Sequence, residues 1–159
     1  MKALILAGLL TSIVAVAHVG IIWVGGPAYR YFGAGEEMAR LAEQGSLRPG
    51  LITAGLTILF AVWAMYAFSG AGVLRRLPLL RTGLVFIGTL YVLRGILVGP
   101  QLVWRLSGYS AAVPIRQLFF SSVSLIIGLA YLIGTHQSWD RLKRVGASAD
   151  GDAIVGRAI

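Results

Sequence analysis

The stretch TLYVLRGILVGPQ, residues 89–101, places the charged side chain of Arg94 among apolar residues. A guanidinium group stays protonated in proteins and can hold a carboxylate or a phosphate through two parallel hydrogen bonds. No aspartate or glutamate occurs within the apolar blocks of the chain. The acceptor that Arg94 meets must therefore come from a loop, from a neutral polar group or from outside the chain.

The candidate partners of Arg94 come from its own helix, from the first and last apolar blocks and from the loops between them. Tyr91 precedes Arg94 by three residues and shares its helix face. His18, when neutral, can accept a hydrogen bond through one ring nitrogen. Together with Arg94 itself, the candidate site residues are His18, Tyr91, Glu36, Glu37, Gln101, Arg116 and Gln117.

Two interpretations of Arg94 follow. In the first, which the sequence favours, the arginine ties an outer loop to a helical bundle through Glu36, Glu37 or backbone carbonyls. In the second, Arg94, His18 and Tyr91, with Arg116 as a second positive charge, line a small pocket in the outer leaflet. Such a pocket would suit an anionic or carbonyl-bearing amphiphile, such as a lipid headgroup or a quinone.

The sequence contains few residues that could form a haem site, a metal site or a catalytic nucleophile. The chain has no cysteine and two histidines, His18 and His136, which fall at opposite ends of apolar blocks and cannot hold one haem between them. A zinc or di-iron site needs more histidine or carboxylate ligands than these blocks contain. The serines of the last block are typical of helix packing rather than of nucleophiles. We expect no cofactor, no metal site and no catalytic residue.

The elements that position these residues are four apolar blocks, at 3–24, 50–68, 78–98 and 113–133. The chain is 57% hydrophobic and 13% charged, with a mean hydropathy of +0.81. About 20 apolar residues are needed to cross a bilayer, and backbone groups in lipid must bond within their own helix. The sequence predicts an all-α integral membrane protein, a bundle of four transmembrane helices over residues 1–145.

Positively charged residues predict the orientation of this bundle, because they concentrate on the cytoplasmic side. The N-terminus, the 69–81 segment and the C-terminal tail carry eight of them, whereas the other two loops carry five. We expect both termini to be cytoplasmic, the loops 25–49 and 99–112 to lie outside, and the plasma (inner) membrane to be the location.

The first outer loop contains GAGEEMARLAEQG, which predicts a short amphipathic helix. Glu36 and Glu37 fall in its first turn, where the helix dipole favours negative charge, and Glu36 can pair with Arg40 four residues on. Met38, Leu41 and Ala42 form an apolar stripe. We expect this helix to cap the bundle or to lie on the bilayer surface.

Two outer segments resemble each other, WVGGPAYRYFG at 23–33 and LVGPQLVWRLSG at 97–108. Each has Val-Gly, a proline, an aromatic residue followed by arginine, and a glycine. If this is a repeat, the fold is two helical hairpins related by an axis along the membrane normal. The alternative is that such residues are common at any outer membrane boundary.

Small residues recur in the first, third and fourth blocks, and they predict close helix packing in lipid. The contact could lie within the chain or in a homodimer, and we favour the first. The first block could also be a signal peptide cleaved after Ala17, although its apolar run continues far enough to span a membrane. The segment 146–159 is expected to be a disordered cytoplasmic tail.

The function predicted from these patterns is binding rather than catalysis. The protein would bind a lipid-like amphiphile or a membrane partner at its outer face. A membrane enzyme or redox subunit acting on a quinone or lipid, and an oligomeric small-solute transporter, are the alternatives. Membrane lipids, a homo-oligomer or a larger membrane complex are the expected partners. Nucleic acid is not, because the basic residues flank the spans.

Overall fold

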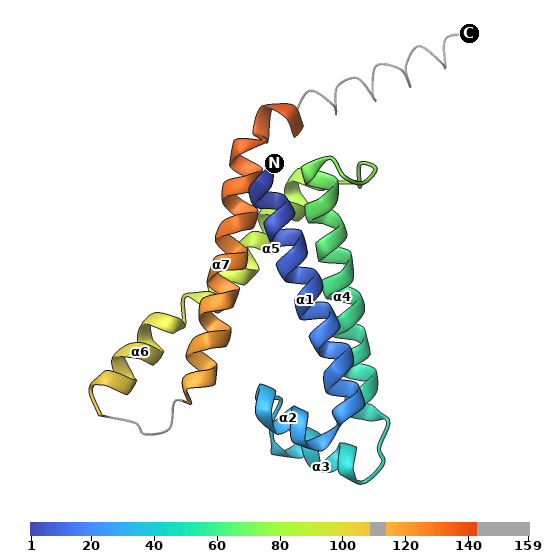
Figure 1. Cartoon of the computed structure of the whole chain (residues 1–159), viewed down its shortest axis with the longest axis vertical. Coiled ribbons are helices and arrows are strands. Elements are labelled where there is room, and N and C mark those ends of the chain that lie inside the picture. The colour runs from blue at the N-terminus through green and yellow to red at the C-terminus, as the bar shows by residue number, and fades with distance from the viewer. Residues whose placement is uncertain (109–113, 143–159) are drawn as a thin grey trace. The chain divides into compact units, whose positions relative to one another are not determined.

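The computed structural model describes residues 1–108 and 114–142, and the regular structure in this part of the chain is helical, without strands (Figure 1). Within these residues, four helical stretches are long and apolar enough to cross a membrane, namely Lys2–Val24, Arg48–Ala71, Leu80–Leu106 and Ile115–Gln137. This confirms the predicted all-helical architecture. The helices are α1 (Lys2–Val24), α2 (Gly26–Phe32), α3 (Glu36–Glu43), α4 (Arg48–Ala71), α5 (Leu80–Gly95), α6 (Val98–Leu106) and α7 (Ile115–Gln137).

The prolines mark where these helices begin. Pro27, Pro49 and Pro100 fall in the first turns of α2, α4 and α6, while Pro78 and Pro114 stand just before α5 and α7. A proline has no N–H to donate, and its fixed φ suits the first turn, where no partner inside the helix exists for that group. The interiors of the four long helices therefore keep an unbroken ladder of backbone hydrogen bonds.

The chain divides into two compact units, which are described separately. The α1–α4 unit is Gly8–Met65. The α5–α7 unit comprises Met1–Ala7 and the described residues from Tyr66 onward. The helices α1 and α4 each contribute residues to both units.

Glycines bring α5 and α7 into direct backbone contact. A Cβ atom added at Gly95 would lie 2.5 Å from the Cα of Leu125, and one added at Gly128 would lie 2.6 Å from the backbone nitrogen of Val92. Without a favourable hydrophobic effect between helices in lipid, such close approach is a main source of packing energy. The predicted role of small residues in packing within the chain is confirmed for α5 and α7.

The first turns of α1 pack into the same unit. Leu4 is fully buried. A Cβ atom at Gly134 would lie 2.7 Å from Cγ of Leu4, and one at Gly70 would lie 3.1 Å from its Cδ1. Leu4 therefore fills the space beside two glycines, one in α4 and one in α7.

The third apolar block is not one uninterrupted helix. Predicted as a span over 78–98 followed by a loop, it forms α5 up to Gly95 and then a separate helix, α6, from Val98. The N–H of Gly99 donates to the carbonyl of Ile96 at 3.2 Å, which is a tighter turn than in an α-helix. Pro100 follows and cannot donate to that carbonyl, so the ladder breaks here. The predicted loop 99–112 is thus helical as far as Leu106.

We predict that Gly95→Ala lowers the free energy of unfolding by about 1–3 kcal/mol, because the added methyl group meets the backbone of α7. Gly99→Ala is the matched control, since a Cβ atom there meets nothing within 4 Å. Thermal unfolding of both variants in detergent measures the difference. Equal stability of the two variants would contradict the proposed backbone contact.

Candidate functional site

The eight residues predicted to surround Arg94 fall in both units. His18, Glu36 and Glu37 belong to the α1–α4 unit. The α5–α7 unit contains the other five, which are Tyr91, Arg94, Gln101, Arg116 and Gln117. A meeting of these two groups stays a prediction, and each group is considered within its own unit.

Arg94 lies in the last turn of α5 and is exposed. Its neighbours Leu93 and Ile96 are large apolar side chains that are 59% and 60% exposed. Asp140 is the one carboxylate among the described residues of this unit, and it lies beyond the far end of α7. The guanidinium of Arg94 therefore has no carboxylate within reach in the described part of its own unit.

Tyr91 and Gln101 have structural contacts. Tyr91 is 5% exposed, and its ring stacks on Tyr131 of α7 with the ring centres 6.1 Å apart. The side-chain oxygen of Gln101, in α6, accepts a hydrogen bond from the Ser121 hydroxyl of α7 at 3.0 Å. These contacts fasten α5 and α6 to α7. The remaining two candidates of this unit, Arg116 and Gln117, are exposed in the first turn of α7.

His18 is half-buried on α1, and its ring contacts Phe60 of α4 with the ring centres 4.9 Å apart. Its Nδ1 lies 2.8 Å from the carbonyl oxygen of Val14. A hydrogen bond to a carbonyl requires the proton to be on Nδ1, which in the neutral ring leaves Nε2 as an acceptor. The ring can thus still receive a donor at its outer edge.

The loop glutamates pair with an arginine that the sequence analysis did not select. Arg30, in the last turn of α2, donates through Nε to Oε2 of Glu36 at 2.9 Å and through Nη2 to Oε2 of Glu43 at 3.0 Å. A second bond joins Arg30 to each carboxylate. The expected pairing of Glu36 with Arg40 is replaced by this contact. Glu37 is exposed.

This pairing shifts the acid–base equilibria of the loop. Hydrogen bonds from Arg30 hold the pKa of Glu36 and of Glu43 below the ordinary value of 4.5. The same bonds raise the pKa of Arg30. A carboxyl group whose pKa is lowered by folding contributes stability above that range and loses it as the pH falls. The loop is therefore held together at neutral pH and loosened by acid.

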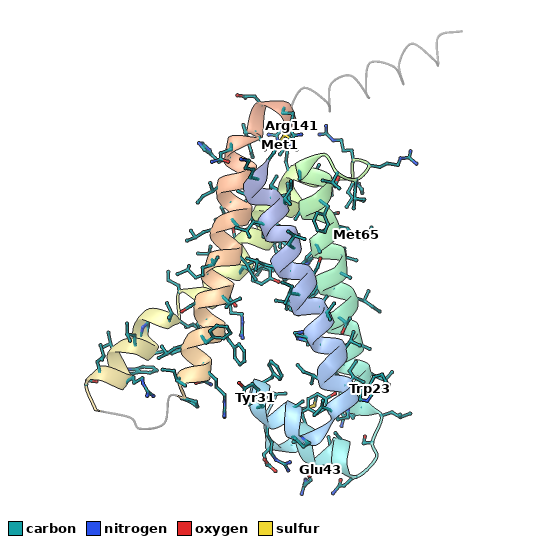
Figure 2. The ribbon with its side chains drawn as sticks, in the orientation of Figure 1. Met1, Trp23, Tyr31, Glu43, Met65 and Arg141 are labelled. Atoms are coloured by element: carbon teal, nitrogen blue, oxygen red, sulfur yellow. The ribbon has the colours of Figure 1, made fainter. Side chains whose placement is uncertain are left out.

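Beneath this ion pair, α2 and α3 share an apolar cluster. Ile21, Ala28, Tyr29 and Ala39 are buried together, and Met38 and Ala42 pack against them. The Tyr29 hydroxyl lies 3.2 Å from the Thr53 hydroxyl of α4, which anchors α2 to that helix. Figure 2 shows Glu43 and Tyr31 in this part of the chain.

A groove at the start of α5 was not predicted from the sequence. It encloses about 1160 Å³, and its lining includes Arg76, Arg81, Val85, Phe86 and Trp139. Arg81 lies in the first turn of α5 and Trp139 lies just after α7. Their contact could not be foreseen because it joins the start of α5 to a residue just after α7.

Among the described residues, no group of three or more histidine, cysteine or acidic side chains lies close enough to hold a metal ion. The chain matches no family model, and no curated protein or solved structure matches it either. The part of the chain that the structure describes thus belongs to an all-helical class, with four helical stretches long and apolar enough to cross a membrane.

We predict that Arg30→Gln reduces the hydrogen-exchange protection of the α3 amides several-fold at pH 7, because both carboxylates lose their donor. In the wild type, the same protection should fall as the pH is lowered below 4.5, the ordinary glutamate value. The variant should lack this pH dependence. Arg40→Gln is the matched control and should lower the protection of α3 much less, because Arg40 acts on Glu36 only through its charge and not through a hydrogen bond. A pH dependence that persists in Arg30→Gln would refute the ion pair.

Proposed function

We propose that this protein is a small integral membrane protein that binds a lipid-like amphiphile, without catalysing a reaction, at the face that carries Arg94. The observation that carries the proposal is the exposed guanidinium of Arg94, flanked by exposed apolar side chains on a helix apolar enough to span a membrane. This combination of a fixed positive charge and apolar surroundings matches the two parts of an anionic amphiphile.

The energetics favour such a ligand. An arginine within the hydrocarbon region costs about 2.5–3.5 kcal/mol on insertion scales. A phosphate or carboxylate held by both arms of the guanidinium offsets part of this cost. Of the loop carboxylates, Glu36 and Glu43 already share Arg30. Both oxygens of each carboxylate already accept hydrogen bonds from Arg30, which weakens the alternative of a purely structural tie to Arg94.

The orientation that this function requires follows from the distribution of positive charge. We propose that the plasma (inner) membrane holds the chain with both termini cytoplasmic. The Arg94 end of α5 would then face outward, together with the loop helices α2 and α3. With its apolar side on the buried cluster and its charged side exposed, α3 suits a cap at the membrane surface.

The predicted internal repeat gains support from the short helices. Each of α1 and α5 is followed by a short helix with a proline in its first turn and an arginine in its last, Arg30 in α2 and Arg105 in α6. Each short helix is followed by a glycine with positive φ, at Gly33 and Gly108. We propose two related helical hairpins, in which Arg30 and Arg105 hold corresponding positions in the short helices.

We predict that Arg94→Gln lowers the number of amphiphile molecules that co-purify with each protein chain by about one, because the ligand's anionic group loses its bidentate donor. Native mass spectrometry of protein released from the same membranes measures the occupancy. Added oleate and a short-tailed quinone test the carboxylate and carbonyl classes separately. Arg105→Gln, which removes an arginine from α6 in the same unit, should retain the ligand.

Equal occupancy in Arg94→Gln and wild type would contradict the proposed function. Lower thermal stability of Arg94→Gln with unchanged occupancy would instead assign Arg94 the role of a structural tie. The two results are separable because stability and occupancy are measured on the same preparations.

The absence of cysteine from the sequence permits a direct test of orientation. We predict that Gln44→Cys, just after α3, reacts with a membrane-impermeant maleimide in sealed right-side-out vesicles. Val73→Cys, in the loop between α4 and α5, should react only after the vesicles are opened. The opposite labelling pattern would reverse the proposed orientation.

A further inference from the structure

The groove at the start of α5 joins a positively charged end to an apolar wall. Arg76 and Arg81 supply the charge. Val85 and Phe86, one turn further along α5, line the same groove and are 38% and 59% exposed. Because the stretch Leu80–Leu106, which is α5 together with α6, is apolar enough to span a membrane, this wall opens where acyl chains would lie.

Arg81 is held in position by an aromatic ring. Its guanidinium carbon lies 4.2 Å from the ring centre of Trp139, the distance of a cation–π contact. Its Nε atom is buried and donates no hydrogen bond to any described residue. A buried donor without an acceptor is costly, so the cation–π contact is the interaction that the described residues offer this side chain in return.

The loop that presents Arg76 is also fixed. The Ser69 hydroxyl donates to the carbonyl of Arg75 at 2.8 Å and accepts from the N–H of Leu77 at 3.1 Å. The Tyr66 hydroxyl donates to the carbonyl of Pro78 at 3.1 Å. Arg76 itself donates through Nη2 to the carbonyl of Leu142 at 2.7 Å. A preorganised loop lowers the entropy that a ligand would otherwise lose on binding.

The first turn of α5 adds further donors at this end of the groove. The residue before it, Leu79, has a positive φ of 51° and provides no side-chain cap. The N–H groups of the first turn point out of the helix without an intrahelical partner, and they carry the positive end of the helix dipole. These donors supplement the two arginines.

From this arrangement we infer that the groove is a binding site for an anionic phospholipid. The phosphate would lie between Arg76 and Arg81, and an acyl chain would follow Val85 and Phe86. A free phosphate would use the charged end and leave the apolar wall without a role. A zwitterionic lipid would bring its own cation close to two arginines.

This site is separate from the one proposed at Arg94. The two arginines of α5, Arg81 and Arg94, are 13 residues apart in one helix, which corresponds to about 20 Å along its axis. With the proposed orientation, the groove faces the cytoplasmic leaflet, where anionic lipids attract basic residues. A result that contradicts the proposal for one site would not contradict the proposal for the other.

The experiment is native mass spectrometry of the full-length protein with an equimolar mixture of phosphatidylglycerol and phosphatidylcholine. The wild type should bind phosphatidylglycerol selectively. Arg81→Gln and Arg76→Gln should each weaken this binding about fivefold, the value for one basic group near an anionic membrane surface. Arg75→Gln removes the same charge from a residue that does not line the groove, and it should bind as the wild type does.

A second variant, Val85→Trp, tests the apolar wall of the groove. The indole ring fills this wall without changing the charge, so the variant should bind less phosphatidylglycerol than the wild type. Inorganic phosphate added as a competitor should not displace the lipid. Three results would overturn the inference: equal binding of the two lipids, retention of phosphatidylglycerol by both Arg76→Gln and Val85→Trp, or displacement of the lipid by inorganic phosphate.

Discussion

A guanidinium group next to hydrocarbon needs hydrogen-bond acceptors, and this need organises the polar part of the structure. In the outer loop, Arg30 is satisfied by two carboxylates. In the α5–α7 unit, Arg76 and Arg141 donate to backbone carbonyls at or beyond helix ends, where no intrahelical partner exists. The guanidinium of Arg81 lies over the indole ring of Trp139. Arg76, Arg81 and Arg94, which form no ion pair among the described residues, are the arginines that we assign to membrane ligands.

The glycine contact between α5 and α7 decides where the arginines of α5 can point. Gly88 and Gly95 are buried against α7 and fix that face of the helix. Arg94 is the residue before Gly95, so it points about 100° away around the helix axis. The close backbone packing therefore keeps Arg94 off the interface with α7 and leaves its charge exposed.

Much of the architecture could be predicted from the sequence because apolar length and small-residue spacing act locally. The four spanning helices and the glycine face of α5 follow from such patterns. The break between α5 and α6 was not predicted because Gly99 and Pro100 were interpreted as a membrane boundary. A proline is equally common in the first turn of a new helix, which is where Pro100 lies.

The candidate site was harder to predict because it depends on which charged groups meet. Glu36 was expected to pair with Arg40, four residues further along the same helix, α3, but the spacing takes no account of a competing arginine from another helix. The turn at Gly33 brings α2 alongside α3, and Arg30 reaches both Glu36 and Glu43 from there. The contact of Arg81 with Trp139 depends on packing between distant segments, which no local pattern encodes.

The account can be tested most directly by carbon–phosphorus dipolar dephasing in solid-state NMR, with the protein carrying ¹³C at Cζ of arginine in phospholipid bilayers. Signals are assigned by comparison with single arginine-to-glutamine variants. The account predicts strong dephasing by lipid ³¹P at Arg76 and Arg81 and little at Arg30, whose donors are held by Glu36 and Glu43. Dephasing at Arg76 and Arg81 as weak as that at Arg30 would contradict it.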